Sequence, residues 1–196
     1  MQKLQLAGQQ AENMFDGGDY WVEWVHPGTA PATTATGKAF NTMAGVIKSH
    51  CPKCLNLNGC RFLKSKMPEI PLHENCHCYA NPIAEPNAAA ECDLRKFTDY
   101  IFNSNPLVNK GKKALFESWG YDIMSSERLQ AEFIKQAQEK YAKGEYELDI
   151  LNDYGQRIDI EIILSRNDGK ADVSFISGWM VYPDGTIKLT TPYGGI

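Results

Sequence analysis

The sequence predicts an α+β protein preceded by a small, cysteine-rich metal-binding module. Three observations lead to this prediction. All six cysteines lie within residues 51–92. From residue 94 to residue 143, apolar residues recur at helical spacing, and from residue 146 to residue 191 they alternate with polar residues as in strands. Helices followed by an antiparallel sheet are typical of the α+β class.

Composition and charge exclude several classes of protein. The 196 residues are 43% hydrophobic and 22% charged, which indicates a globular chain with a sizeable core. The formal net charge of −4 excludes a generally basic protein that coats nucleic acid. No apolar run approaches the ~20 residues that span a bilayer, so we expect no membrane partner. Residues 1–14 contain glutamines where a signal peptide needs an apolar core, which predicts a cytoplasmic protein without a signal peptide.

Changes in composition divide the chain into four parts. Residues 1–47 form an N-terminal segment that ends in a connector rich in Thr, Ala, Pro and Gly. Residues 48–80 form the cysteine module. Residues 81–92 contain two prolines and several alanines, which is typical of a linker. Residues 93–196 form the α+β domain.

The N-terminal segment contains an aromatic stretch, YWVEWV, at residues 20–25. Its alternation predicts a strand. Two exposed tryptophans would be unusual, so we expect Trp21 and Trp24 to anchor this strand to the cysteine module or to the second domain.

The α+β domain should contain helices followed by a four-stranded antiparallel meander. Ser126 is a suitable N-cap and Gly144 a suitable stop, so the longest helix is expected over residues 127–143. It should cover the apolar face of the sheet and leave the other face polar and open. Shorter helices are expected over residues 94–101 and 111–119, and strands over residues 146–150, 157–164, 171–175 and 187–191, joined by turns that contain glycine.

Two pairs of cysteines have the spacing of metal ligands. Zn²⁺ takes four thiolate or imidazole ligands in a tetrahedron, and a C-x2-C sequence supplies two of them from one turn. A structural zinc ion would also explain how a short segment with few aliphatic residues folds. The expected zinc ligands are Cys51, Cys54, Cys76 and Cys78, with His73 and Cys60 as alternates.

Two other interpretations of these cysteines stay open. They could be reduced thiols that pack as small hydrophobic side chains, although five cysteines and a histidine seldom cluster by chance. A redox-active C-x2-C is the third interpretation, but no thioredoxin-like βαβ pattern surrounds residues 51–54. Cys92 lies beyond the linker and is not expected to be a ligand.

The cysteine module contains two longer motifs, CPKCLNLNG at residues 51–59 and IPLHENCHC at residues 70–78. Together they resemble the C-terminal signature of Mu-F-like phage minor head proteins, in which a C-x2-C and a glycine precede a P-x-H-P-N-C-R-C ending. This chain has Glu74 in place of the proline and His77 in place of the arginine. The resemblance covers residues 48–80 without the helical body of that family. It therefore implies the tail of a phage-related protein or a mobile-element relative, association with a phage particle, and a phage head component as partner.

The sequence between Glu23 and Glu69 contains basic residues but no acidic ones. Such a local patch can bind nucleic acid or an acidic protein surface. The alternative is a solvated surface that offsets the thiolate charge of the metal site. The residues of this basic patch are Lys48, Lys53, Arg61, Lys64 and Lys66.

The α+β domain also contains recognisable segments, namely KFTDYIF at residues 96–102, KGKKALFESWGY at 110–121, GWMVYP at 178–183 and LTTPY at 189–193. Over residues 94–195 they resemble an uncharacterised domain family at the C-termini of bacterial polymorphic toxins and phage-related proteins. Such toxin domains often have the barnase/EndoU/colicin/RelE-like ribonuclease fold. The resemblance therefore implies that fold, an RNA substrate and an immunity protein as partner.

Ribonuclease chemistry needs a base, an acid and cations that stabilise the phosphorane. No histidine follows His77, so the α+β domain cannot use a histidine pair. If the domain cuts RNA, its catalytic groups should share one cleft. The candidate catalytic residues, which would act without a metal by analogy with RelE-like enzymes, are Lys113, Arg157, Lys188, Thr190 and Tyr193.

Acidic residues on the same strands oppose this interpretation. Side chains such as Asp149 and Asp159 on the open face should repel phosphate. Arg157 and Lys188 would then pair across strands with these carboxylates. Three functions therefore remain: a toxin-like ribonuclease effector, a non-enzymatic interaction module with a structural zinc ion, and a degenerate mobile-element remnant.

Overall fold

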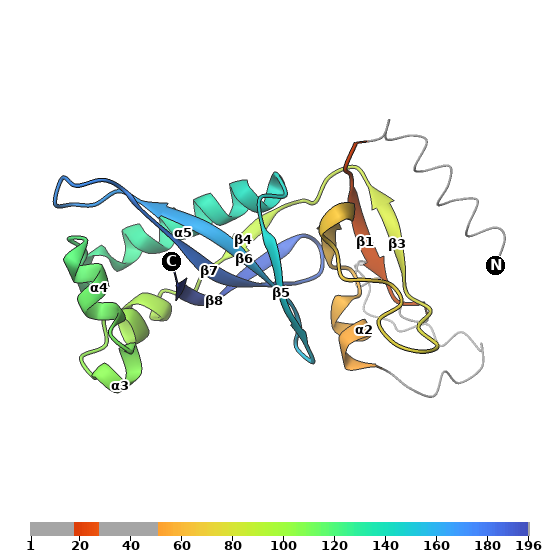
Figure 1. The fold of residues 1–196 in the computed structure, drawn as a ribbon, viewed down its shortest axis with the longest axis horizontal. Coiled ribbons are helices and arrows are strands. Elements are labelled where there is room, and N and C mark those ends of the chain that lie inside the picture. Colours follow the sequence, from red (N-terminus) through yellow and green to blue (C-terminus); the bar gives the residue numbers. More distant parts are fainter. Residues whose placement is uncertain (1–17, 28–50, 196) are drawn as a thin grey trace, which may run out of the picture.

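The computed structural model describes residues 18–27 and 51–195. Figure 1 shows an elongated molecule with a small sheet at one end, short helices at the other, and a larger sheet between them. One long helix runs along the larger sheet. None of the helices in these two ranges is long and apolar enough to cross a membrane.

The small sheet contains the predicted aromatic strand as its central member. β1 (Trp21–Val25) lies between β2 (Arg61–Leu63) and β3 (Tyr79–Ile83), and both pairings are antiparallel. The helix α2 (Pro52–Leu57) precedes β2, and the 3-10 turn η1 (Lys64–Lys66) follows it. The strand that the aromatic alternation predicted is therefore present.

The larger sheet differs in part from the predicted meander. β5 (Glu147–Asn152), β6 (Gly155–Leu164), β7 (Val173–Val181) and β8 (Thr186–Gly195) form the expected antiparallel order. Within the described residues a further strand, β4 (Ala89–Glu91), pairs in parallel with β8, so the order is β4-β8-β7-β6-β5. The prediction of four strands was wrong because it missed β4. This strand has only three residues, two of them alanines, and its partner β8 lies about a hundred residues later in the chain.

The helices begin and end close to their predicted positions. The long helix α5 (Ser126–Ala142) buries Phe133, whose ring lies 5.1 Å from that of Phe97 and 5.9 Å from that of Phe175 on β7. This confirms that α5 covers the apolar face of the sheet. The remaining helical segments are the π-helix η2 (Lys96–Ile101), α3 (Pro106–Asn109), α4 (Lys112–Ser118) and the 3-10 turn η3 (Ile123–Ser125).

One edge of β6 is bound by a side chain of α5. β5 pairs with β6 only from Gly155 to Asp159. Beyond Asp159, the edge of β6 on that side has no neighbouring strand among the described residues. There Gln136 donates its amide N–H to the carbonyl of Ile163 and accepts the Ile163 backbone N–H, at 2.6 and 2.9 Å. Both backbone groups of Ile163 are thereby hydrogen-bonded.

The small sheet packs directly on the end of the larger one. The Trp21 ring meets the Tyr141 ring of α5 edge-on, with centroids 5.2 Å apart. The Tyr141 hydroxyl donates to the carbonyl of Arg61 at 2.5 Å, and the Tyr146 hydroxyl accepts the backbone N–H of Leu63 at 2.9 Å. Buried residues from both sheets form one continuous core. The segment expected to be a linker, residues 81–92, accordingly contains the end of β3 and all of β4.

Candidate metal centre

The first pair of cysteines lies at the start of α2. Cys51 is the extended N-cap residue, Pro52 occupies the first helical position, and Cys54 lies one turn later on the buried side. Proline suits this position because its missing N–H would have no helical partner there. The turn closes with a hydrogen bond from the Leu55 N–H to the Cys51 carbonyl at 3.1 Å. Both thiols therefore emerge from one turn.

The second group of ligand-type residues comes from the loop that precedes β3. The Cys76 N–H donates to the carbonyl of His73 at 3.1 Å, which closes a turn. Asn75 has a φ of 60° within this turn, and asparagine tolerates such a left-handed conformation better than most residues. The turn directs His73, Cys76 and Cys78 toward α2.

Cys54 is the point where the two groups meet. Its Sγ lies 3.2 Å from His73 Nε2 and 3.9 Å from Cys76 Sγ. Cys51, Cys54 and His73 form one group whose ligand atoms lie within 4.8 Å of one another, and Cys54, Cys76 and Cys78 form a second such group. Ligands at about 2.3 Å from a tetrahedral metal ion lie about 3.8 Å apart, so this spacing suits a metal ion. These side chains could hold one.

The ring of His73 is oriented as in a metal ligand. Its Nδ1 lies 2.8 Å from the carbonyl oxygen of Glu74. A carbonyl oxygen can only accept a hydrogen bond, so Nδ1 carries a proton, and in the neutral ring Nε2 then presents its lone pair toward Cys54. A backbone carbonyl that fixes the tautomer in this way is a common outer partner of metal-bound histidine.

Trp24 supplies a second observation that fits a bound metal. Its indole Nε1 is buried and has no hydrogen-bond partner among the residues that the structure describes. Burial raises the pKa of Cys78, and the neighbouring Trp24 indole acts in the opposite direction. A thiolate held by a metal ion would accept the indole N–H better than a neutral thiol.

The thiols of the cluster differ in their acidity. Burial and the adjacent thiols of Cys78 and Cys51 raise the pKa of Cys54. Burial also opposes the ionisation of Cys76, but hydrogen bonds from the backbone of Cys78 and Leu72 outweigh it and lower the pKa of Cys76. A cation would stabilise the thiolate form of all these residues.

The two remaining cysteines lie apart from the cluster. The Sγ of Cys60 lies 3.4 Å from the carbonyl oxygen of Asn56 and 3.6 Å from that of Val181, which share its single S–H donor, and the thiol so faces β7. Cys60 belongs to neither ligand group of the described residues. Cys92 is buried beside α5, where Gln130 donates to its carbonyl at 2.6 Å.

The comparison with known families concerns the part of the chain beyond the cysteine cluster. The family described as "Domain of unknown function (DUF6883)" matches residues 85–195. The chain belongs to the DUF6883 family. No curated protein and no solved structure matches it. The match includes β4 and every later element, so the DUF6883 domain starts within the segment that the sequence predicted to be a linker.

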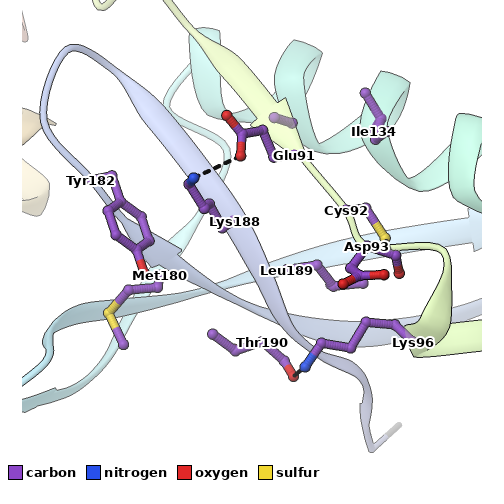
Figure 2. Close-up of a pocket in the computed structure, with 11 residues that line it drawn as sticks. Glu91, Cys92, Asp93, Lys96, Ile134, Met180, Tyr182, Lys188, Leu189 and Thr190 are labelled. Atoms are coloured by element: carbon purple, nitrogen blue, oxygen red, sulfur yellow. Dashed lines mark hydrogen bonds and ion pairs between the residues drawn. The ribbon is translucent and has the colours of Figure 1, made fainter. Parts of the chain in front are cut away.

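Three predicted catalytic residues lie on the face of the DUF6883 sheet opposite α5. The Arg157 guanidinium packs over Gly178, and a Cβ added at residue 178 would collide with it. The Thr190 hydroxyl lies against the same glycine. Arg157 forms an ion pair with Asp149 at 3.3 Å, as the pairing alternative predicted. Lys188 and Thr190 line one pocket, which Figure 2 shows.

The other two predicted catalytic residues do not line this pocket. Tyr193 packs into the aromatic core, with its ring 5.4 Å from that of Phe175 and 6.3 Å from that of Trp119. Lys113 lies on α4 with its Nζ 3.9 Å from Glu117. The structure therefore brings together only part of the predicted set.

Two residues of the predicted basic patch are paired with carboxylates. Arg61 lies 3.3 Å from Glu23 and 3.9 Å from Asp184. Lys66 lies 2.8 Å from Glu147 and donates to the carbonyl of Tyr146. The Lys64 ammonium lies 3.6 Å from the sulfur of Met67. Lys53 is half-buried on α2, and Lys48 lies outside the described residues.

Sequence reasoning missed two residues that the structure makes prominent. Trp24 was expected only to anchor a strand, because no sequence pattern places an indole beside a distant cysteine. Lys96 was expected only as part of a helix, yet its ammonium lies in the pocket of Figure 2. No sequence signal identified this lysine, because its neighbours in the pocket come from β4 and β8.

Proposed function

We propose that the protein is a non-enzymatic interaction module whose N-terminal part is held together by one structural zinc ion. Cys54, Cys76 and Cys78 supply three ligands, and either Cys51 or His73 supplies the fourth. The observation that carries the proposal is the convergence of ligand atoms from α2 and from residues 73–78 on the Sγ of Cys54. Phage head components remain the proposed class of partner, by resemblance alone.

The chemistry of these side chains favours zinc in a structural role. Sulfur and imidazole ligands in a tetrahedral arrangement are the set that Zn²⁺ prefers, whereas Ca²⁺ and Mg²⁺ prefer oxygen. Catalytic zinc sites keep one position for water. Here five ligand-type side chains are available for four positions, which favours a closed site.

The zinc content of the purified full chain tests this proposal. We expect one zinc ion per chain by elemental mass spectrometry, and loss of that ion in Cys76→Ser and Cys78→Ser. Cys60→Ala is the matched control, because Cys60 is a cysteine of the same module outside the cluster. It should keep its zinc. A full equivalent of zinc in both serine variants would overturn the proposal.

The fourth ligand can be identified by cobalt substitution. Co²⁺ in a tetrahedral sulfur site gives visible absorption that depends on the number of thiolates. If His73 is the ligand, His73→Gln should change this spectrum and Cys51→Ser should leave it unchanged. The reverse result would assign Cys51.

A ribonuclease is the second candidate function, and the shared location of Arg157, Lys188 and Thr190 on one sheet face favours it. The ribonuclease-like fold belongs to this candidate as well. Incubation of the full chain with total RNA, followed by sequencing of the ends, tests it. Cleavage that disappears in Lys188→Ala would support an active site at this face. Absence of cleavage, or equal cleavage in the variant, would reject these residues.

A further inference from the structure

A pocket of about 770 Å³ opens where β4 ends beside β8. The pairing of β4 with β8 stops at Glu91 and Lys188, while β8 continues to Gly195. The chain then turns away through Asp93 into η2, which leaves space beside the continuing strand (Figure 2). A pocket of this size is typical of small-molecule binding sites.

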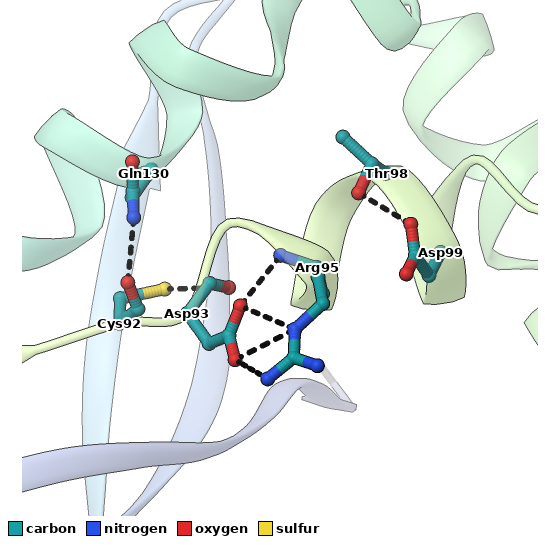
Figure 3. A network of polar contacts seen from close by, with 6 residues as sticks. All are labelled: Cys92, Asp93, Arg95, Thr98, Asp99 and Gln130. Atoms are coloured by element: carbon teal, nitrogen blue, oxygen red, sulfur yellow. Dashed lines mark hydrogen bonds and ion pairs between the residues drawn. The ribbon is translucent and has the colours of Figure 1, made fainter.

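The carboxylates at this pocket are already neutralised. Glu91 forms an ion pair with Lys188 at 2.7 Å. Asp93 accepts hydrogen bonds from the backbone N–H and the guanidinium of Arg95, as Figure 3 shows. These bonds lower the pKa of Asp93 to about 2, so it is ionised and paired. Each carboxylate is therefore engaged mainly with a cation other than Lys96.

Lys96 is a half-buried cation that forms no direct ion pair in the described parts of the chain, although its charge helps to lower the pKa of Asp93. Its ammonium donates to the backbone carbonyl of Thr190 at 2.8 Å. An ammonium has three donors, so two remain for a ligand. The bond to the strand fixes the position of the charge at one end of the pocket.

The rest of the pocket offers apolar surface. On the face that carries Lys188, the side chains of Met180 and Tyr182 line the pocket, and the Tyr182 ring lies 5.1 Å from the Lys188 ammonium. Leu189 and Ile134 line it from the side that faces α5. The Cys92 thiol also lines the pocket, and burial raises its pKa to about 12, so it stays neutral. Gln130 holds the adjacent backbone from α5 (Figure 3).

We propose that this pocket binds a small carboxylic acid, with the carboxylate on the Lys96 ammonium and an apolar body against Met180 and Tyr182. One unpaired ammonium balances a single negative charge, which favours a carboxylate over a phosphate dianion. The carboxylate could belong to a free acid or to the C-terminus of a peptide. This inference goes beyond the proposed zinc centre and does not depend on it.

Calorimetric titration of the full chain tests the proposal with four probes. We expect 3-phenylpropionate to bind if free acids are accepted, and N-acetylphenylalanine to bind more tightly if a peptide C-terminus is the ligand. 3-Phenylpropanamide has nearly the same shape without the charge and should bind at least about tenfold more weakly. Phenyl phosphate, if it bound more tightly than both acids, would overturn the carboxylate assignment in favour of phosphate.

Two variants with opposite expected effects separate binding from folding. Lys96→Met should weaken binding of the acids at least about tenfold, since it removes a charge-assisted hydrogen bond. Glu91→Gln should strengthen it, because Lys188 would lose its partner and become a second cation of the pocket. Lys143→Met is the matched control, as Lys143 is exposed at the end of α5 and should not matter. Equal affinity in Lys96→Met and the control would overturn the proposal, as would weaker binding in Glu91→Gln.

Discussion

The cysteine module and the DUF6883 domain are stabilised in different ways. The module and β1 together have three short strands, and their fully buried large side chains include Trp24, Leu57 and Phe62. The DUF6883 domain has an aromatic core between α5 and a long-stranded sheet, with Phe133 and Phe175 at its centre. Small apolar cores rarely suffice for independent stability, whereas a helix packed on a sheet does. If the proposed zinc ion is bound, we expect the module to depend on it and on the neighbouring domain for stability.

The largest expected effect comes from removal of the shared ligand. Cys54→Ser should unfold the module, because the free energy of binding a structural zinc ion is of the order of 10 kcal/mol. Hydrogen exchange should show loss of amide protection in β1, β2 and β3, while β6 and β7 keep theirs.

Iodoacetamide labelling provides a control for this experiment. Cys92 belongs to the DUF6883 domain, and burial raises its pKa to about 12, so it should stay unmodified in Cys54→Ser. Labelling of Cys92 at the same rate as Cys76 would show that both parts unfold together.

Phe133→Ala should have the next largest effect and should act on the domain. Truncation of a fully buried phenylalanine leaves a cavity and costs about 3–5 kcal/mol. Urea unfolding followed by circular dichroism measures this loss. Lys135→Ala on the exposed side of α5 is the matched control and should change stability by less than about 0.5 kcal/mol. A similar loss in both variants would contradict the assigned core.

Tyr141→Phe tests the contact between the two parts. It removes the hydroxyl that donates to the Arg61 carbonyl and leaves that acceptor without this partner. We expect a loss of about 1–2 kcal/mol in urea unfolding. Tyr154→Phe is the control, because Tyr154 is 82% exposed and should be neutral. If both substitutions are neutral, the hydroxyl does not join the two parts.

The smallest effect is expected for Lys66→Gln. Lys66 joins the module to Glu147 of the domain, but the Glu147 side chain is 80% exposed. Exposed ion pairs contribute at most about 1 kcal/mol and are screened by salt. A small loss at low salt that becomes smaller in 1 M NaCl is the expected result, because the hydrogen bond from Lys66 to the Tyr146 carbonyl does not depend on the ion pair. A loss as large as that of Tyr141→Phe would show a stronger coupling than the geometry indicates.

Patterns that lie within one segment of sequence could be read correctly. The burial of Leu129, Phe133, Ala137 and Tyr141 follows the predicted helical spacing, and the pairing of β6 with β7 follows the alternation of apolar residues. The metal cluster could be predicted for a similar reason, since each half of it is a short local motif. The order of α5 and the strands after it was therefore accessible from sequence, but the bounds were not: the strand predicted over residues 171–175 is β7, which continues to Val181.

Features that depend on distant pairings could not be read in this way. β4 consists of three residues and is defined by its parallel register with β8. The ion pair of Lys188 with Glu91 follows from that register. The pairing of β1 with β2 and β3 could not be predicted either. Nothing local in residues 21–25 specifies which strands will be its antiparallel partners.

The hydrogen bonds of Gln136 to Ile163 have a consequence for self-association. An unpaired strand edge is a template on which a second chain can add its own strand. The glutamine amide presents one donor and one acceptor at the positions where such a strand would place its peptide group. It thereby closes this stretch of β6 to edge-to-edge aggregation, at a place where the neighbouring strand of the sheet is too short to do so.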